Sequence, residues 1–160
     1  MRGTLLFGLV LAAACAALPS AGARADEPGE ACTGHPGEVK LYVNVEGVRS
    51  SQGLIAVTLY ADDSKKFLAK RGSLYVGRVS AHQGMTRACI YVPKPGMYGV
   101  AVYHDADANR HLNRNALGMP QEAYGFSNNP GTFFGIPRFS SVRFPVRGPQ
   151  AEIKVRLKYP

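Results

Sequence analysis

Apolar and polar residues alternate along most of this chain. The segments 39–46 and 152–159 are the clearest cases, because almost every second residue is apolar and those between are mostly charged or polar. A period of two with many β-branched residues is typical of a strand with one buried and one solvated face. We therefore expect strands over residues 39–46, 54–61, 73–81, 86–92, 97–104, 139–146 and 152–159.

Short turns rich in glycine and proline separate these segments. Residues 93–96 form one such turn, because their prolines preset φ and the final glycine can adopt a positive φ. Residues 64–71 do not alternate and predict a short helical turn or loop with Phe67 and Leu68 directed inward. Seven short strands without a long helix favour an all-β fold, a single antiparallel β-sandwich over residues 39–160.

The longest connection of the predicted sandwich covers residues 105–135. It opens with oxygen-bearing side chains at every second position, directly after a predicted strand. This is the spacing of a calcium loop, in which alternate residues turn oxygen ligands toward one centre. The predicted ligands are Asp105, Asp107 and Asn109, the backbone carbonyl of His111, and Asn113.

The loop departs from an EF-hand at two defining positions. The sixth position is Arg110 instead of glycine, and the twelfth is Ala116 instead of a bidentate carboxylate. Glu122 could fold back and complete the ligand shell. The alternative is an ion-free turn, in which aspartate and asparagine side chains bond to the nearby backbone.

A transition metal is a further alternative for the same connection. His104 and His111, together with Asp105, could form such a site, because imidazole nitrogen favours zinc or copper over calcium. This alternative predicts a metal-dependent enzyme with its site within residues 104–135.

Residues 125–129, Gly-Phe-Ser-Asn-Asn, partly match a nucleophile elbow. Asn129 stands where the second glycine belongs, and no positioned base is evident. We interpret this segment as a loop in which Phe126 plugs one end of the sandwich while Asn128 and Asn129 cap local backbone. Aromatic residues in this part of the chain also suggest a ligand platform formed by Tyr124, Phe126 and Asn128.

The first 25 residues have the pattern of an export signal. Arg2 precedes the apolar run 5–18, and Ala23-Arg24-Ala25 offers a small-residue cleavage site. We expect a periplasmic or secreted protein with no transmembrane span after the signal is removed. Lipidation at Cys15 remains an alternative.

Two cysteines, Cys32 and Cys89, follow the predicted signal. An even number of cysteines in an oxidising compartment predicts a disulfide between them. Residues 26–38, rich in glycine, proline and charge, should be a flexible leader that this bond ties down. The formal net charge is +8, but Lys and Arg never cluster with aromatic residues, so nucleic acid is not an expected partner.

Three segments resemble one bacterial exported family, domain of unknown function 2141 (DUF2141). They are residues 97–109 (Met-Tyr-Gly-Val-Ala-Val-Tyr-His-Asp-Ala-Asp-Ala-Asn), 117–120 (Leu-Gly-Met-Pro) and 122–129 (Glu-Ala-Tyr-Gly-Phe-Ser-Asn-Asn). The resemblance extends over about residues 39–159. It implies an exported domain with an immunoglobulin-like or transthyretin-like sandwich, and it implies no activity. The sequence departs from the family at Arg110 and Asn113, where many relatives carry glycine and an acidic residue.

Together these observations predict a non-catalytic binding or structural domain. A calcium ion would order the long connection, and the aromatic residues of that connection would face an unidentified ligand or envelope component. Preordering a loop in this way removes the entropy cost of ordering it during binding.

Overall fold

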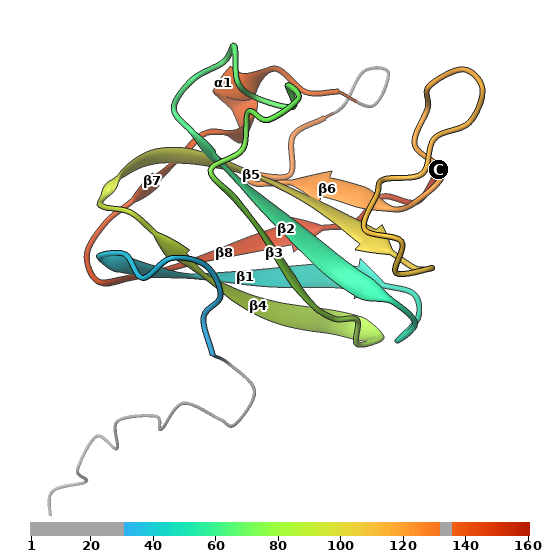
Figure 1. The fold of residues 1–160 in the computed structure, drawn as a ribbon, viewed down its shortest axis with the longest axis horizontal. Helices are drawn as coiled ribbons and strands as arrows, with labels where there is room; N and C mark the ends of the chain where they lie inside the picture. The colour runs from blue at the N-terminus through green and yellow to red at the C-terminus, as the bar shows by residue number, and fades with distance from the viewer. Residues whose placement is uncertain (1–30, 132–135) are drawn as a thin grey trace, which may run out of the picture.

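The computed structural model describes residues 31–131 and 136–160. In this part of the chain, eight strands and one short helix follow one another (Figure 1). Their bounds are β1 Val39–Val48, β2 Leu54–Ala61, β3 Tyr75–Ser80, β4 Gly84–Val92, β5 Gly96–Asp105, β6 Tyr124–Phe126, α1 Phe139–Val142, β7 Phe144–Val146 and β8 Gln150–Arg156.

The strands form two sheets that pack face to face. One sheet has the order β4-β1-β8, and the other has the order β3-β2-β5-β6, with β7 also pairing with β5. The predicted all-β sandwich is confirmed. Every strand pair is antiparallel except β1 and β8, which run parallel, with Val43 opposite Ile153.

The core lies between the two sheets and follows the alternation in the sequence. In β1, Val43 and Val45 are fully buried, and in β2, Val57 and Leu59 are fully buried against them. Burying such side chains stabilises the fold by roughly 1.5–3 kcal/mol each, before the entropy of ordering them is subtracted.

The predicted strand over residues 139–146 is wrong in its first half. Residues 139–142 form the helix α1, which buries Phe139 and Val142, and only Phe144–Val146 is a strand. Phe139 packs against β5 where Gly99 leaves room, because a Cβ at Gly99 would lie 2.8 Å from the Phe139 ring. Apolar residues three apart share one face of a helical turn but fall on opposite faces of a strand, so the spacing of Phe139 and Val142 fits the helix.

The strand β6 lies inside the predicted long connection and was not expected. It pairs with β5 and also touches the end of β8, where the Tyr124 N–H donates to Lys158 O at 3.0 Å. Gly125 permits this approach, since a Cβ there would lie 2.6 Å from Arg156 O. The connection is thereby divided, and its first part is the 105–123 loop.

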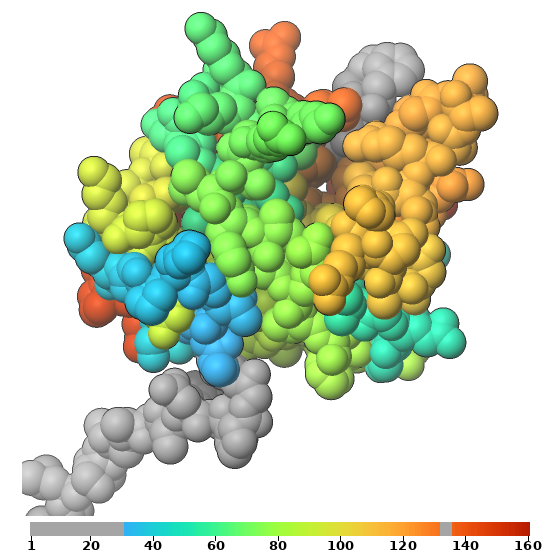
Figure 2. Space-filling view, in the orientation of Figure 1, coloured from blue at the N-terminus to red at the C-terminus, as the bar shows by residue number. Residues whose placement is uncertain are grey.

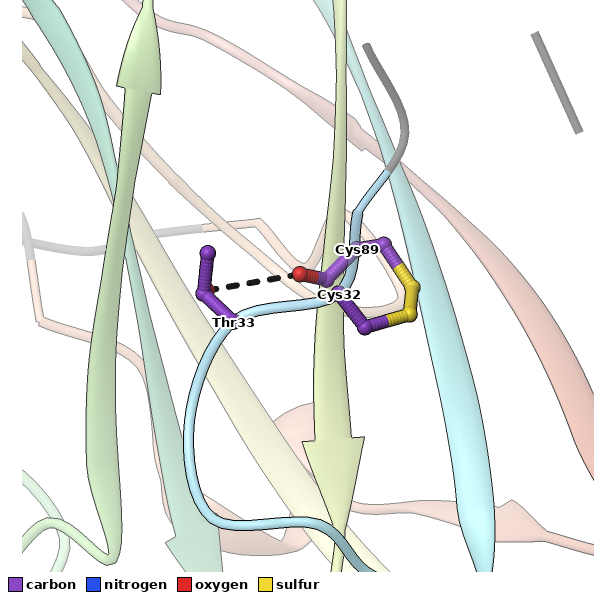
Figure 3. The surroundings of a disulfide bond; sticks show 3 residues. All are labelled: Cys32, Thr33 and Cys89. Carbon is purple, nitrogen blue, oxygen red and sulfur yellow. Dashed lines mark hydrogen bonds between the residues drawn. A yellow bond between two sulfur atoms is a disulfide. The ribbon is translucent and has the colours of Figure 1, made fainter. Parts of the chain in front are cut away.

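A disulfide joins Cys32 to Cys89, as the cysteine count predicted (Figure 3). The adjacent Thr33 N–H donates to Cys89 O at 2.9 Å, and the Tyr91 N–H donates to Thr33 O at 3.1 Å. The described end of the predicted leader therefore lies against β4. The predicted signal, residues 1–25, lies outside the described residues. No helix within them is long and apolar enough to cross a membrane.

Candidate functional site

The 105–123 loop begins at a tightly packed point at the end of β5. Asp105 pairs with Leu54 at the start of β2 and is 0 % exposed. Gly53 lies directly against the peptide that leaves β5, because a Cβ at Gly53 would lie 2.0 Å from Asp105 O. Gly53 also has a φ of +72°, which favours glycine. The base of the loop is therefore held by the sheet.

Three carboxylates meet in this loop. Asp105, Asp107 and Glu122 each place one oxygen within 4.8 Å of the other two. Calcium binds oxygen at 2.3–2.6 Å, so two oxygens on one ion can be up to about 5 Å apart. The fold therefore brings Glu122 back to the predicted aspartates, in an arrangement that could hold a calcium ion.

Two of these carboxylates each accept two hydrogen bonds from backbone N–H groups of the loop. Asp105 accepts hydrogen bonds from the N–H groups of Asn109 at 3.0 Å and Arg110 at 2.8 Å. Glu122 accepts from the N–H groups of Ala106 at 3.2 Å and Asn113 at 3.0 Å. Hydrogen bonds to an ionised acceptor are stronger than neutral ones, so these four bonds determine the shape of the loop.

The two asparagines direct amide nitrogen toward the acidic group. The Asn109 Nδ2 donates to Asp107 Oδ2 and to Asn113 Oδ1, both at 2.9 Å, and the Asn113 Nδ2 donates to Asp107 Oδ2 at 3.0 Å. The Asn109 Oδ1 instead accepts from the His111 N–H at 2.7 Å. The asparagines that were predicted as ligands thus bond to Asp107, to each other and to the backbone.

This network lowers the pKa of Asp107. The main cause is the hydrogen bond from the Asn113 side chain, which favours the charged carboxylate. The backbone adopts positive φ at Ala108 (56°) and at Arg110 (66°). Arg110 occupies the position where an EF-hand has glycine, so the local geometry is reached without that residue.

The two histidines do not join the carboxylates. His104 is buried, with Nε2 at 2.8 Å from Gln52 O and Nδ1 at 3.3 Å from the Tyr159 hydroxyl. His111 is exposed. Among the described residues, the acidic group includes neither histidine, so the predicted set of His104, Asp105 and His111 does not come together.

Ser127 is a structural residue. It is fully buried, and its Oγ accepts from the Val100 N–H at 3.0 Å and donates to Val142 O at 2.6 Å. The Asn128 Nδ2 donates to Arg143 O at 2.9 Å, and the Asn129 Oδ1 accepts from the Arg156 N–H at 2.7 Å. Both asparagines bond to backbone groups, but the partners are 15 and 27 positions away and not local as predicted.

A recess of about 290 Å³ lies beside the loop, on the outer face of the larger sheet. Figure 2 shows a hollow between the segment after β2 and the 105–123 loop. Tyr124 and Phe126 of the predicted platform line it, whereas Asn128 does not. No sequence pattern marked the other lining residues, which include Thr58, Tyr60, Leu68, Ala101, Tyr103 and Arg114.

Burial raises the pKa of two tyrosines of the recess, Tyr60 and Tyr103. At Tyr103 the Arg78 guanidinium opposes this rise, but burial is the larger effect. Both hydroxyls therefore keep their protons at neutral pH and can donate hydrogen bonds. The ring of Phe67 packs edge-on against Tyr60 at 5.2 Å, as the predicted inward direction of Phe67 requires. Leu68 is 40 % exposed, so its predicted inward position is wrong.

Comparison with known proteins gives one match. The model of the family described as "Uncharacterized protein conserved in bacteria (DUF2141)" matches residues 43–154, which include both sheets and the 105–123 loop. No curated protein and no solved structure matches the chain. The family match covers well over half of the sequence, so this chain belongs to the DUF2141 family.

Proposed function

We propose that the protein is a non-catalytic binding domain whose 105–123 loop is ordered by a calcium ion. The observation that supports this proposal is the meeting of three carboxylates, from Asp105, Asp107 and Glu122, within 4.8 Å. In the described part of the chain, the ion pairs of Lys and Arg involve other acidic residues. A hard divalent cation is the natural partner for such a group of oxygens.

The ion would hold together the two ends of the loop. Asp105 and Asp107 lie at its start, while Glu122 lies just before β6. Bound there, calcium would add to the hydrogen bonds that already close the loop. The loop would then present a fixed surface to a ligand, because its entropy of ordering has been lost beforehand.

The proposed location is the periplasm or the exterior of the cell. The residues of the predicted signal support it, and a disulfide is expected in an oxidising compartment. Fractionation of cells that express the full chain would test this location. Mass analysis of the mature amino terminus would distinguish cleavage after Ala25 from lipidation at Cys15.

A purely structural envelope domain without an ion is the second candidate. The hydrogen bonds from the Asn109 Nδ2 to Asp107 and Asn113 favour this candidate. In them an amide nitrogen, and not an ion, contacts the side-chain oxygens. The two candidates differ in one measurable property, the effect of calcium on stability.

Thermal unfolding of the mature protein in calcium and in chelator tests the proposal. At a calcium concentration 100 times Kd, binding to the folded state adds about 2.7 kcal/mol. This corresponds to a rise in Tm of roughly 5–10 °C for a domain of this size. The same Tm in calcium and in chelator would reject the calcium-ordered loop and support the structural candidate.

Asp107→Asn is the most informative variant for this test. Asp107 is exposed, so its replacement leaves the backbone bonds of buried Asp105 in place. We expect the variant to lose most of the calcium-dependent rise in Tm. Asp63→Asn is the matched control, because it removes the same charge from an exposed turn and an amide oxygen can still accept the Lys65 N–H.

A further inference from the structure

We infer that the recess beside the 105–123 loop binds a small carboxylate that carries a single aromatic ring. This inference deepens the proposed function, because it names a ligand class for a binding domain. It rests on the domain being a binding module and does not require the calcium ion.

The hollow arises from small side chains on the outer face of the sheet. Thr58 on β2 lies opposite Ala101 on β5, and Ala101 lies opposite Phe126 on β6. Small residues at these two central positions leave space between larger neighbours. Most outer faces of antiparallel sheets meet water through polar side chains, so a concave and largely apolar outer face is unusual.

The walls of the recess suit a flat apolar ring. Tyr60 and Phe126 line it. The ring of Phe67 contacts both, with its centroid 5.2 Å from that of Tyr60 and 6.0 Å from that of Phe126. Tyr124 stands next to Phe126, with their ring centroids 5.9 Å apart. Aromatic side chains that are held by such ring contacts can offer offset and edge-on contacts to the ring of a ligand.

The volume restricts the size of the ligand. An apolar cavity of about 150 Å³ is large enough to hold benzene. The recess, at about 290 Å³, has room for one ring with one polar substituent. It lies at the lower end of the range of about 300–1,000 Å³ that is usual for small-molecule sites.

The polar groups of the recess favour a negatively charged substituent. Arg114 is the charged residue among those that line it. Its Nη1 donates to Gly118 O at 2.8 Å, which holds the side chain in place. A guanidinium has five donors in a planar fork that matches a carboxylate. Tyr103 also belongs to the lining, and its hydroxyl can donate a second hydrogen bond.

Sugars are a less suitable class for this site. A sugar ring presents several hydroxyl groups, and each needs a partner once it leaves water. The described lining offers few polar side chains, namely Thr58, Arg114 and the tyrosine hydroxyls, among mostly apolar ones. An aromatic carboxylate needs only one polar contact point, which Arg114 supplies.

Titration of the mature protein with benzoate, followed by amide NMR shifts, tests the inference. We expect saturable shifts for residues of the recess, such as Thr58, Ala101 and Tyr103. Benzyl alcohol has the same ring without the charge, and we expect it to bind at least tenfold more weakly. Methyl glucoside should give no saturable shifts in the recess.

Two variants locate the binding site. Ala101→Leu fills the centre of the recess and should abolish benzoate shifts there. Arg114→Gln should weaken benzoate binding at least tenfold, while Arg147→Gln, the matched loss of an exposed positive charge outside the recess, should leave it unchanged. Unperturbed amide shifts of β1 and β8 in each variant would show that the sandwich is intact.

The possible results separate this inference from the proposed function. Absence of recess shifts with benzoate would overturn the inference, and so would equal binding by Arg114→Gln or preferential binding of the glucoside. Calcium-dependent Tm is measured on the same sample. A rise in Tm without benzoate binding would leave the calcium-ordered loop standing and reject only the ligand class.

Discussion

Single polar side chains in this domain complete the hydrogen bonds of buried backbone. Ser127 accepts from the Val100 N–H of β5 and donates to the last carbonyl of α1. Asn128 and Asn129 adopt positive φ, of 63° and 47°, and bond to the backbone of two different segments. Residues 127–129 thus connect three parts of the fold, and these bonds give the sequence block a structural role.

Ser127→Ala should destabilise the protein. The Val100 N–H would remain buried without its acceptor, which costs about 1–3 kcal/mol. Ser141→Ala, which removes an exposed hydroxyl bonded to Arg138 O, should cost less than about 1 kcal/mol. Urea unfolding measures both free energies. Equal losses for the two variants would contradict the structural role of Ser127.

Asn113→Ala should raise the pKa of Asp107 toward its ordinary value of 3.8. The Asn113 side chain is the main cause of the lowered pKa, because it donates to the charged form. A lowered folded pKa stabilises the protein above the unfolded pKa, and this contribution is lost as pH falls through the folded pKa. In the variant the folded and unfolded pKa values lie closer together, so this contribution should be smaller at neutral pH than in the wild type.

Carboxyl NMR titration in chelator measures this pKa directly. Asn115→Ala is the matched control, because the Asn115 Oδ1 accepts from the N–H groups of Leu117 and Met119 and does not contact Asp107. A pKa of Asp107 that is the same in wild type and Asn113→Ala would show that another group causes the shift.

Among the elements, β6 has a structural importance out of proportion to its three residues. It adds a strand to the larger sheet beside β5 and contacts the end of β8 in the smaller sheet. Because β6 begins two residues after Glu122, its pairing returns that carboxylate to Asp105. Its aromatic residues form one wall of the recess. The candidate cation site and the recess therefore both depend on where β6 pairs.

Gly125→Ala should weaken this element. A Cβ at this position would lie 2.6 Å from Arg156 O and 2.8 Å from Val155 Cγ1, so backbone has to move. We expect a loss of about 1–3 kcal/mol in the free energy of unfolding. Gly131→Ala is the control, since its Cβ would meet nothing within 4 Å, and it should change stability by less than about 0.5 kcal/mol.

At the scale of the whole molecule, the two sheets and the amino-terminal segment form one packed unit. The Cys32–Cys89 bond joins this segment to β4 across 57 positions of sequence. For a closed loop of that length, the chain-entropy account gives a stabilisation of about 4 kcal/mol. The bond acts together with the backbone pairing of Thr33 and β4.

Replacing both cysteines by serine should lower the free energy of unfolding by about 2–4 kcal/mol. The measurement is guanidinium unfolding with and without a reductant. Reductant should destabilise the wild type and leave the double variant unchanged. A double variant as stable as the wild type would show that the amino-terminal segment is held by its other contacts.

Much of the fold was predictable because strand patterns are local. The alternation around Val43 and Val57 identified buried faces correctly, and it located most strand ends within a few residues. Residues 139–142 were assigned wrongly, because the alternation of Val142, Phe144 and Val146 was extended back to Phe139, which lies three positions before Val142. The alternation shows which face of a strand is buried but not which strand lies beside it. It therefore did not predict that β8 pairs in parallel with β1.

The candidate site was predictable only in part. Asp105 and Asp107 lie two positions apart, so a loop pattern shows that they are neighbours. Glu122 meets them only because β6 returns to β5. The amide of Asn109 was expected to offer oxygen but directs its nitrogen toward Asp107. A rotation about one side-chain bond decides this, and sequence spacing carries no information on it.

By itself the sequence determined most of the strands, the sandwich class and the family, because alternation and short motifs are properties of neighbouring residues. Tertiary structure alone decided that Glu122 joins the aspartates, that His104 turns into the interior, and that Thr58 and Ala101 lie beneath a recess. These arrangements bring together residues far apart in the chain. They depend on which strands pair and in which register, and those choices are made by the packing of the whole molecule.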